Sequence, residues 1–218
     1  TVLVASFGKD FEDGGEGNDT LFFLGSSNSV TDVTYNLSNG TQGVTGSTLT
    51  TGFANIENLK AGYLYQTGVY EGSNWNITAI GSTEANRIET SEGNDIIESG
   101  GGIDTLIGNG GNDEYIIKGH GTDTVNIYDN GGSGDVFSIV DNPSGTDNAA
   151  FLVTANNDLI RVTNSGHTDI IHNHNGAVSV EFYQWIAPSD VAVPIGYDKF
   201  EIEVDPAQYD SLDKVFIG

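Results

Sequence analysis

Aspartate and glycine recur at fixed spacing in the middle of the chain. Residues 90–116 read as three consecutive nine-residue units, TSEGNDIIE, SGGGIDTLI and GNGGNDEYI. Each unit has glycine at its fourth position, aspartate at its sixth and an apolar residue at its eighth: Gly93, Asp95 and Ile97; Gly102, Asp104 and Leu106; Gly111, Asp113 and Tyr115. Glycine lets a tight turn adopt conformations in which carbonyl oxygens converge, and aspartate adds a carboxylate. Calcium prefers such oxygen ligands, so the units predict a repeated calcium-binding turn.

An earlier copy of the unit, GGEGNDTLF, lies at residues 14–22. It fits the pattern G-G-x-G-x-D-x-U-x at every position, where U is a large apolar residue. Asp19 is its candidate side-chain ligand, and Gly15 and Gly17 are its candidate backbone ligands. An ordinary glycine-containing hairpin is the alternative interpretation, but the complete match favours calcium. Because of these repeats, the chain resembles the RTX (repeats-in-toxin, haemolysin-type) calcium-binding repeat proteins.

The resemblance implies a fold, a cofactor and a route of export. The implied fold is all-β, a parallel β-roll of nonapeptide turns that holds several Ca²⁺ ions. RTX proteins use type I secretion, so the resemblance also implies a secreted or bacterial cell-surface location. The chain would then be a fragment of a large secreted protein such as an RTX adhesin.

In a β-roll, the ligands that share an ion lie eighteen residues apart, in turns n and n+2. Two pairs of candidate ligands obey this spacing: Asn86 with Asp104, and Asp95 with Asp113. Asp104 and Asp123 miss the spacing by one residue, which predicts a bulge near Ile117. A flexible glycine-rich linker would not keep aspartate, glycine and an apolar residue in phase over four turns, so that alternative is disfavoured.

Two further glycine turns follow the repeats. GHGTDTVNI puts Gly121 and Asp123 in motif positions, and YDNGGSGDVFSI puts Asp129 and Asp135 around another glycine turn, in which Ser133 replaces a glycine. The predicted metal ligands are Gly15, Gly17, Asp19, Asn86, Gly93, Asp95, Gly102, Asp104, Asn109, Gly111, Asp113, Gly121, Asp123 and Asp135.

A strand-rich insertion separates the first motif from the main repeats. Alternating threonine and valine with Asn-Gly and glycine turns predicts short strands. The order of landmark residues in this segment resembles an RTX spacer, and the matching residues are Asp32, Tyr35, Asn36, Leu37, Gly40, Ile56, Glu57 and Asn58. Residues 62–75 add three tyrosines and Trp75, which the family pattern lacks. They are interpreted either as an aromatic plug over one end of the roll or as a recognition loop.

The sequence predicts a single module over residues 1–218. It comprises a first motif (1–23), a strand-rich insertion (24–75), a main repeat block (76–139) and a C-terminal β cap (140–218). Four apolar runs separated by Asn- and Gly-containing turns predict an antiparallel meander in the cap. Residues 187–218 do not match the family and contain the alternating strand KFEIEV and a short helical turn at 207–215.

Composition restricts the partners of the chain. It has 31 Asp and Glu against 7 Lys and Arg, a formal net charge of -24, and no cysteine. This charge argues against electrostatic binding of nucleic acid or an anionic membrane and favours cations. Stacked carboxylates repel one another without a counter-ion, so we expect the chain to be largely unfolded in low calcium.

The sequence contains no recognisable catalytic site. His167, His172 and His174 could bind a transition metal, but polar residues on a solvated hairpin are the simpler interpretation. Glu201 and Glu203 fit an exposed strand face. We therefore expect a non-catalytic module, monomeric within a larger chain, with no nucleic-acid partner and no membrane insertion. One hypothesis is an adhesin domain that binds a host or surface peptide or glycan; the other is a passive secretion and folding domain of an enzyme or pore-forming toxin.

Overall fold

The computed structural model contains strands and turns. It describes residues 1–6, 11–25, 32–44, 50–66, 69–117, 124–129, 131, 135–140, 149–153, 159–163, 168–172, 178–185, 197–204 and 214–217. None of these residues belongs to a helix that is long and apolar enough to cross a membrane. The chain is all-β, as the sequence predicts.

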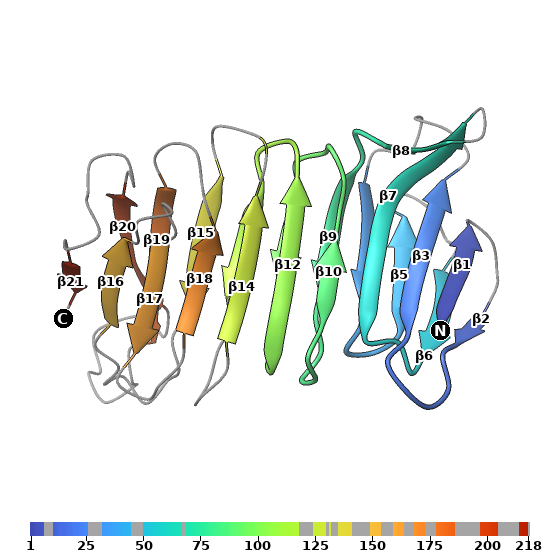
Figure 1. The fold of residues 1–218 in the computed structure, drawn as a ribbon, viewed down its shortest axis with the longest axis horizontal. Coiled ribbons are helices and arrows are strands. Elements are labelled where there is room, and N and C mark those ends of the chain that lie inside the picture. Colours follow the sequence, from blue (N-terminus) through green and yellow to red (C-terminus); the bar gives the residue numbers. More distant parts are fainter. Residues whose placement is uncertain are drawn as a thin grey trace.

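Two sheets extend along the long axis of the molecule (Figure 1). The first sheet has the order β1 (Val2–Ser6), β3 (Thr20–Gly25), β7 (Asn58–Gln66), β10 (Arg87–Glu89), β12 (Ile103–Asn109), β14 (Thr124–Asp129), β18 (Thr168–His172), β17 (Leu159–Thr163), β16 (Ala149–Val153) and β21 (Lys214–Ile217), with β8 (Val69–Gly72) paired to β7. The second has the order β2 (Phe11–Asp13), β6 (Thr50–Ala54), β5 (Thr41–Val44), β4 (Asp32–Asn36), β9 (Asn76–Ile80), β11 (Ile96–Glu98), β13 (Glu114–Ile117), β15 (Val136–Val140), β19 (Val178–Trp185) and β20 (Tyr197–Val204).

In the repeat block the chain alternates between the two sheets, so each strand pairs in parallel with the second strand after it. Ile88 lies opposite Leu106 in the first sheet, and Ile97 lies opposite Tyr115 in the second. Both pairs are eighteen residues apart, which means that two nine-residue units complete one circuit. The nonapeptide period of the sequence therefore sets the register of a parallel β-roll.

The sequence separation between paired residues of neighbouring strands increases after Tyr115. Leu106 lies opposite Ile127, 21 residues on, and Tyr115 lies opposite Phe137, 22 residues on. Asp104 accordingly faces Val125, and the one-residue bulge predicted near Ile117 is wrong. The physical reason is that the connection from β13 to β14 contains three more residues than a nonapeptide turn.

The core lies between the sheets and consists of the apolar residues that alternate inward along each strand. The eighth position of each repeat belongs to it, and Ile97, Leu106 and Tyr115 are fully buried. The Tyr115 ring stacks on Phe137 with 5.1 Å between ring centroids. Each such side chain contributes roughly 1.5–3 kcal/mol through removal of apolar surface from water.

The insertion extends both sheets. β4, β5 and β6 form an antiparallel meander in the second sheet, and β7 and β8 form a hairpin at the edge of the roll (Figure 1). Trp75 is only 1% exposed and lies in the hydrophobic core, so it is not part of an open recognition loop. The side chains of Tyr65 and Tyr70 lie outside the described part of the structure.

After the repeats, parallel pairing gives way to antiparallel pairing. In the first sheet β18 pairs in parallel with β14, and β17 then pairs antiparallel with β18. In the second sheet β19 pairs in parallel with β15, and β20 then pairs antiparallel with β19. KFEIEV lies in β20, as expected for a strand. Lys214 and Val215 belong to β21, so the end of the helical turn predicted at 207–215 is extended instead, because it pairs with β16.

Candidate calcium sites

The turns of the roll lie in two rows along its opposite edges, at the top and bottom of Figure 1. The upper turn row contains residues 90–95 and 108–113 with Asp129, Gly131 and Asp135. The lower turn row contains residues 14–19, 55–57, 81–86 and 99–102. Because strands two apart are neighbours, turns n and n+2 lie next to each other within one row.

A ladder of hydrogen bonds connects the aspartates of the upper row. Asp95 Oδ1 accepts the Ile77 amide at 2.7 Å, and Asp113 Oδ1 accepts the Asp95 amide at 2.8 Å. Asp135 Oδ1 accepts the Asp113 amide at 3.0 Å, although it lies 22 residues on. The structure thus places Asp95, Asp113 and Asp135 in consecutive turns of one row.

The lower row contains a similar ladder. Asp104 Oδ1 accepts the Asn86 amide at 2.9 Å, and the Thr1 nitrogen lies 2.6 Å from Asp19 Oδ1. Glu57 Oε2 accepts the Asp19 amide at 2.8 Å. Glu57 therefore takes the position of a motif aspartate, and sequence reasoning missed this because it lies 38 residues after Asp19 rather than eighteen.

The side chain of Asn86 makes hydrogen bonds within its own turn and to a neighbouring turn. Its Oδ1 accepts the Ser82 amide at 2.6 Å, and its Nδ2 donates to the Glu57 carbonyl at 2.7 Å. An amide can both donate and accept, whereas a carboxylate only accepts. The turn that contains Asn86 is consequently closed by hydrogen bonds at the position where the other units have a carboxylate.

The second carboxylate oxygens of Asp95 and Asp113 are buried, and no donor lies in hydrogen-bonding geometry to them. Each residue is 1% exposed. Burial raises the pKa of Asp95 to about 7. Burial also raises the pKa of Asp113 to about 8, and the charges of Asp95, Asp129 and Asp135 add to the rise. A buried acceptor without a donor is costly, and a cation at these oxygens would remove that cost.

The glycines of the upper row allow neighbouring turns to stack closely. A Cβ atom on Gly93 would lie 1.8 Å from the Trp75 carbonyl oxygen, and one on Gly111 would lie 1.9 Å from the Gly93 carbonyl oxygen. The backbone φ angle of Gly111 is +111°, which L-residues with side chains rarely adopt. Only glycine permits carbonyls of adjacent turns to approach in this way.

The remaining candidate backbone positions lie in turns or, for Asn109, at the end of a strand. Positive φ angles occur at Gly15, Gly17, Gly102 and Asn109. The Asn109 side chain donates to the Thr90 carbonyl at 2.7 Å, so its Nδ2 connects two turns of the upper row. Gly121 and Asp123 lie outside the described residues.

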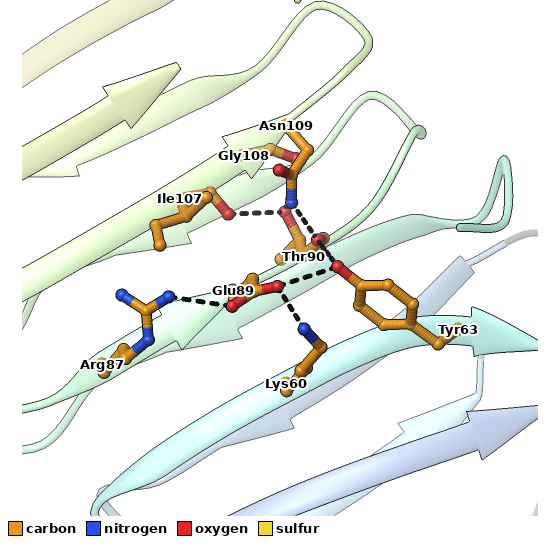
Figure 2. Close-up of polar contacts among 8 residues, drawn as sticks. All are labelled: Lys60, Tyr63, Arg87, Glu89, Thr90, Ile107, Gly108 and Asn109. Carbon is orange, nitrogen blue, oxygen red and sulfur yellow. Dashed lines mark hydrogen bonds and ion pairs between the residues drawn. The ribbon is translucent and has the colours of Figure 1, made fainter. Parts of the chain in front are cut away.

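A polar cluster on the outer face fixes the start of the Thr90 turn (Figure 2). The Glu89 carboxylate accepts from Lys60 at 2.5 Å, Tyr63 at 2.9 Å and Arg87 at 3.0 Å. Burial acts to raise the pKa of Glu89, but these donors hold it below its usual value. The next residue, Thr90, donates to the Gly108 carbonyl at 3.1 Å. The cluster therefore joins β7, β10 and the end of β12.

The sequence places Asp129 beside the last glycine turn, but Asp129 is not among the predicted ligands. Asp113, Asp129 and Asp135 are all buried, and one carboxylate oxygen from each lies within 4.8 Å of the other two. Asp129 precedes the glycine turn and therefore has no motif position. Its signal is the alternation of β14, in which Val125, Ile127 and Asp129 all face inward.

The histidines and glutamates considered as alternative metal or catalytic residues belong to the C-terminal part of the chain. His172 lies in β18, while His167 and His174 are outside the described residues. Glu201 and Glu203 lie in β20, opposite Glu181 and Ser179. The side chains of all five histidine and glutamate residues concerned lie outside the described part of the structure, so these alternatives stay predictions.

Comparison with known proteins agrees with the geometry of the turns. A family described as the RTX calcium-binding nonapeptide repeat matches in four copies, over residues 2–28 and 80–115. No curated protein matches the chain. The matched residues include Asp19, Asp95, Asp104 and Asp113, whose turns stack in the two rows. RTX repeats bind Ca²⁺ at multiple sites, form β-rolls, and typically belong to non-catalytic modules of proteins exported by type I secretion. The chain therefore contains RTX calcium-binding nonapeptide repeats, which form a parallel β-roll.

Proposed function

We propose that this chain is a calcium-dependent folding module of a secreted protein. The observation that supports the proposal is that Asp95 Oδ2 and Asp113 Oδ2 are buried without a hydrogen-bond donor. In a calcium-poor cytosol these carboxylates lack a counter-ion, and the chain stays unfolded and competent for export. Extracellular calcium at roughly 0.1–1 mM then drives folding, because the free energy of ion binding becomes free energy of folding.

Circular dichroism of the chain in chelator and in millimolar calcium tests this function. We expect little β-structure in chelator and a cooperative gain of β-structure when calcium is added. Magnesium at the same concentration is the control, since it demands a stricter octahedral geometry and keeps its waters. Equal β content in chelator and in calcium would contradict the proposal.

We further propose that the folded module is non-catalytic and acts as a ligand-binding domain of a cell-surface RTX adhesin. Support comes from the outer face of the first sheet, where strand pairing aligns Val4, Phe22, Lys60, Ile107 and Tyr128 in one row, with Glu89 between Lys60 and Ile107. Val4 is 57% exposed and Tyr128 is 41% exposed. The Lys60 ammonium lies 4.6 Å from the centre of the Tyr63 ring. Aromatic, aliphatic and cationic groups together favour recognition of a peptide or a glycan.

Calcium-dependent binding to peptide and glycan arrays tests the adhesin role. We expect captured ligands to be lost when Phe22→Ala or Tyr128→Ala is introduced and kept when Glu84→Gln changes an exposed turn residue. Arrays that capture nothing would favour the alternative, in which the module only assists secretion and folding of an enzyme or a pore-forming toxin. In either case we propose a monomeric module within a larger chain, without a nucleic-acid partner and without insertion into a membrane.

A further inference from the structure

Strand β7 lies between the two parts of the roll that contain calcium-binding turns. On one side it pairs with β3, and the Asp19 amide, just before β3, donates to Glu57 Oε2 at 2.8 Å, just before β7. Asn58 Nδ2 donates to the Asp19 carbonyl oxygen at 3.0 Å. On the other side β7 pairs with β10, which belongs to the main repeat block. In the first sheet, the first motif therefore reaches the main repeat block through β7.

The junction between β7 and β10 is short. β10 has three residues, whereas β7 has nine and β12 has seven. In the second sheet the corresponding junction, between β4 and β9, aligns all five residues of both strands. Because β10 offers few backbone groups for pairing, side chains contribute a larger share of the stabilisation at the junction of β7 and β10.

Two side chains of β7 cross this junction to the Glu89 carboxylate of β10 (Figure 2). The Lys60 ammonium lies 2.5 Å from Glu89 Oε1, and the Tyr63 hydroxyl donates to the same oxygen at 2.9 Å. Arg87 donates to Glu89 Oε2 at 3.0 Å, but Arg87 belongs to β10 itself. Lys60 and Tyr63 thus connect the two strands, whereas the pair of Arg87 and Glu89 lies within one strand.

The contacts of Glu89 form without calcium. The chain has 7 Lys and Arg against 31 Asp and Glu, so most of its carboxylates have no basic side chain to neutralise them. The Glu89 side chain is only 16% exposed, and charge-assisted hydrogen bonds withdrawn from water are stronger than those of exposed ion pairs. The next residue, Thr90, donates to the Gly108 carbonyl at 3.1 Å. Stacking of the repeat turns therefore fixes Glu89 where Lys60 and Tyr63 reach it.

We propose that Lys60 and Tyr63 couple the first motif to the main repeat block, so that folding of the main repeat block raises the calcium affinity of the first motif. The inference rests on the calcium-dependent folding proposed above. The main repeat block has the aspartate turns of Asp95, Asp104 and Asp113, whereas the first motif has Asp19 alone. The main repeat block folds first and presents Glu89, β7 docks on it, and the turn of Asp19 is then held against Glu57 and Asn58.

Hydrogen–deuterium exchange of the whole chain, at a series of free calcium concentrations, tests the coupling. In the unaltered chain we expect residues 14–25 and residues 90–113 to become protected at nearly the same calcium concentration. Lys60→Met combined with Tyr63→Phe removes both donors that cross the junction and nearly preserves the size of the side chains. In this double variant, residues 14–25 should need at least about threefold more calcium than residues 90–113, because bonds to a partly buried charge are lost.

Arg87→Met is the matched control, because it also removes a positive charge beside Glu89 but leaves both donors of β7 in place. It should keep the two calcium midpoints together. Residues 14–25 that never become protected in the double variant, while residues 90–113 do, would also support the coupling.

Equal ratios of the two midpoints in the double variant and in Arg87→Met would overturn the inference. Loss of protection in both segments of the double variant would overturn it as well, because the main repeat block should fold without the first motif. Protection that does not depend on calcium in the unaltered chain would instead refute the proposed function. The two failures are therefore distinguishable.

Discussion

The buried aspartates predict that acid partly replaces calcium in stabilising the fold. The Asp95 carboxyl has a pKa of about 7 in the metal-free folded chain, against 3.8 when unperturbed. The folded state therefore binds more protons than the unfolded state between these two values. Stability of the metal-free protein is highest below the unfolded pKa and is lost as the pH rises toward 7.

The magnitude follows from the size of the shift. Each pKa unit corresponds to about 1.4 kcal/mol, so the metal-free fold should gain about 3 kcal/mol from Asp95 alone between about pH 8 and pH 5. Asp113, with a pKa of about 8, acts in the same direction. Calcium reverses the sign, since the ion binds the ionised carboxylates and its affinity rises with pH.

Urea unfolding of carefully demetallated protein, followed by circular dichroism at several pH values, measures the effect. Trimethylamine N-oxide can be added at constant concentration to populate the folded state. Asp95→Asn should reduce the gain between pH 8 and pH 5 by about 3 kcal/mol. Glu84→Gln, which changes an exposed carboxylate of the lower turn row, should leave it unchanged. The reasoning is refuted if Asp95→Asn and the unaltered chain show the same pH dependence.

Two further predictions concern stability in saturating calcium, measured by chemical unfolding. Gly93→Ala should cost about 3 kcal/mol or more, because its Cβ would lie 1.8 Å from the Trp75 carbonyl oxygen. Gly43→Ala, whose Cβ would contact nothing within 4 Å, is its control, and equal effects would contradict the close stacking of turns. Leu106→Ala should cost about 2–5 kcal/mol, because the side chain is fully buried in the core. Ile103→Ala on the exposed face of the same strand should cost less than about 0.5 kcal/mol, and the opposite ranking would mean that β12 faces the other way.

The sequence predicts the repeat block well because one short pattern specifies both turn and strand. Glycine at the fourth position and aspartate at the sixth define the turn, and the apolar eighth position defines the inward face of the next strand. The eighteen-residue spacing of Asp95 and Asp113 therefore predicts their hydrogen-bonded contact directly. Ile97 and Tyr115 follow as neighbours in the core.

Prediction was less successful where the period breaks. Glu57 lies beside Asp19 in the lower turn row because the insertion between these two residues folds as strands of the sheets. No local sequence pattern predicts a contact over this sequence separation. Asp129 lies outside the motif, and only strand alternation indicates that it faces inward. The three extra residues between Tyr115 and Ile127 shift the register through the length of a connection, which a fixed spacing rule does not anticipate.

Hydrogen bonds run both ways between neighbouring turns of the upper row. The aspartates accept from the earlier turn, from Ile77 to Asp95, then to Asp113 and then to Asp135. The asparagines reverse this sense, because the Asn94 amide donates to Asn76 Oδ1 and the Asn112 amide donates to Asn94 Oδ1. Each interior turn of the row is therefore held by side-chain bonds to both of its neighbours, and loss of either neighbour leaves a backbone amide without its acceptor.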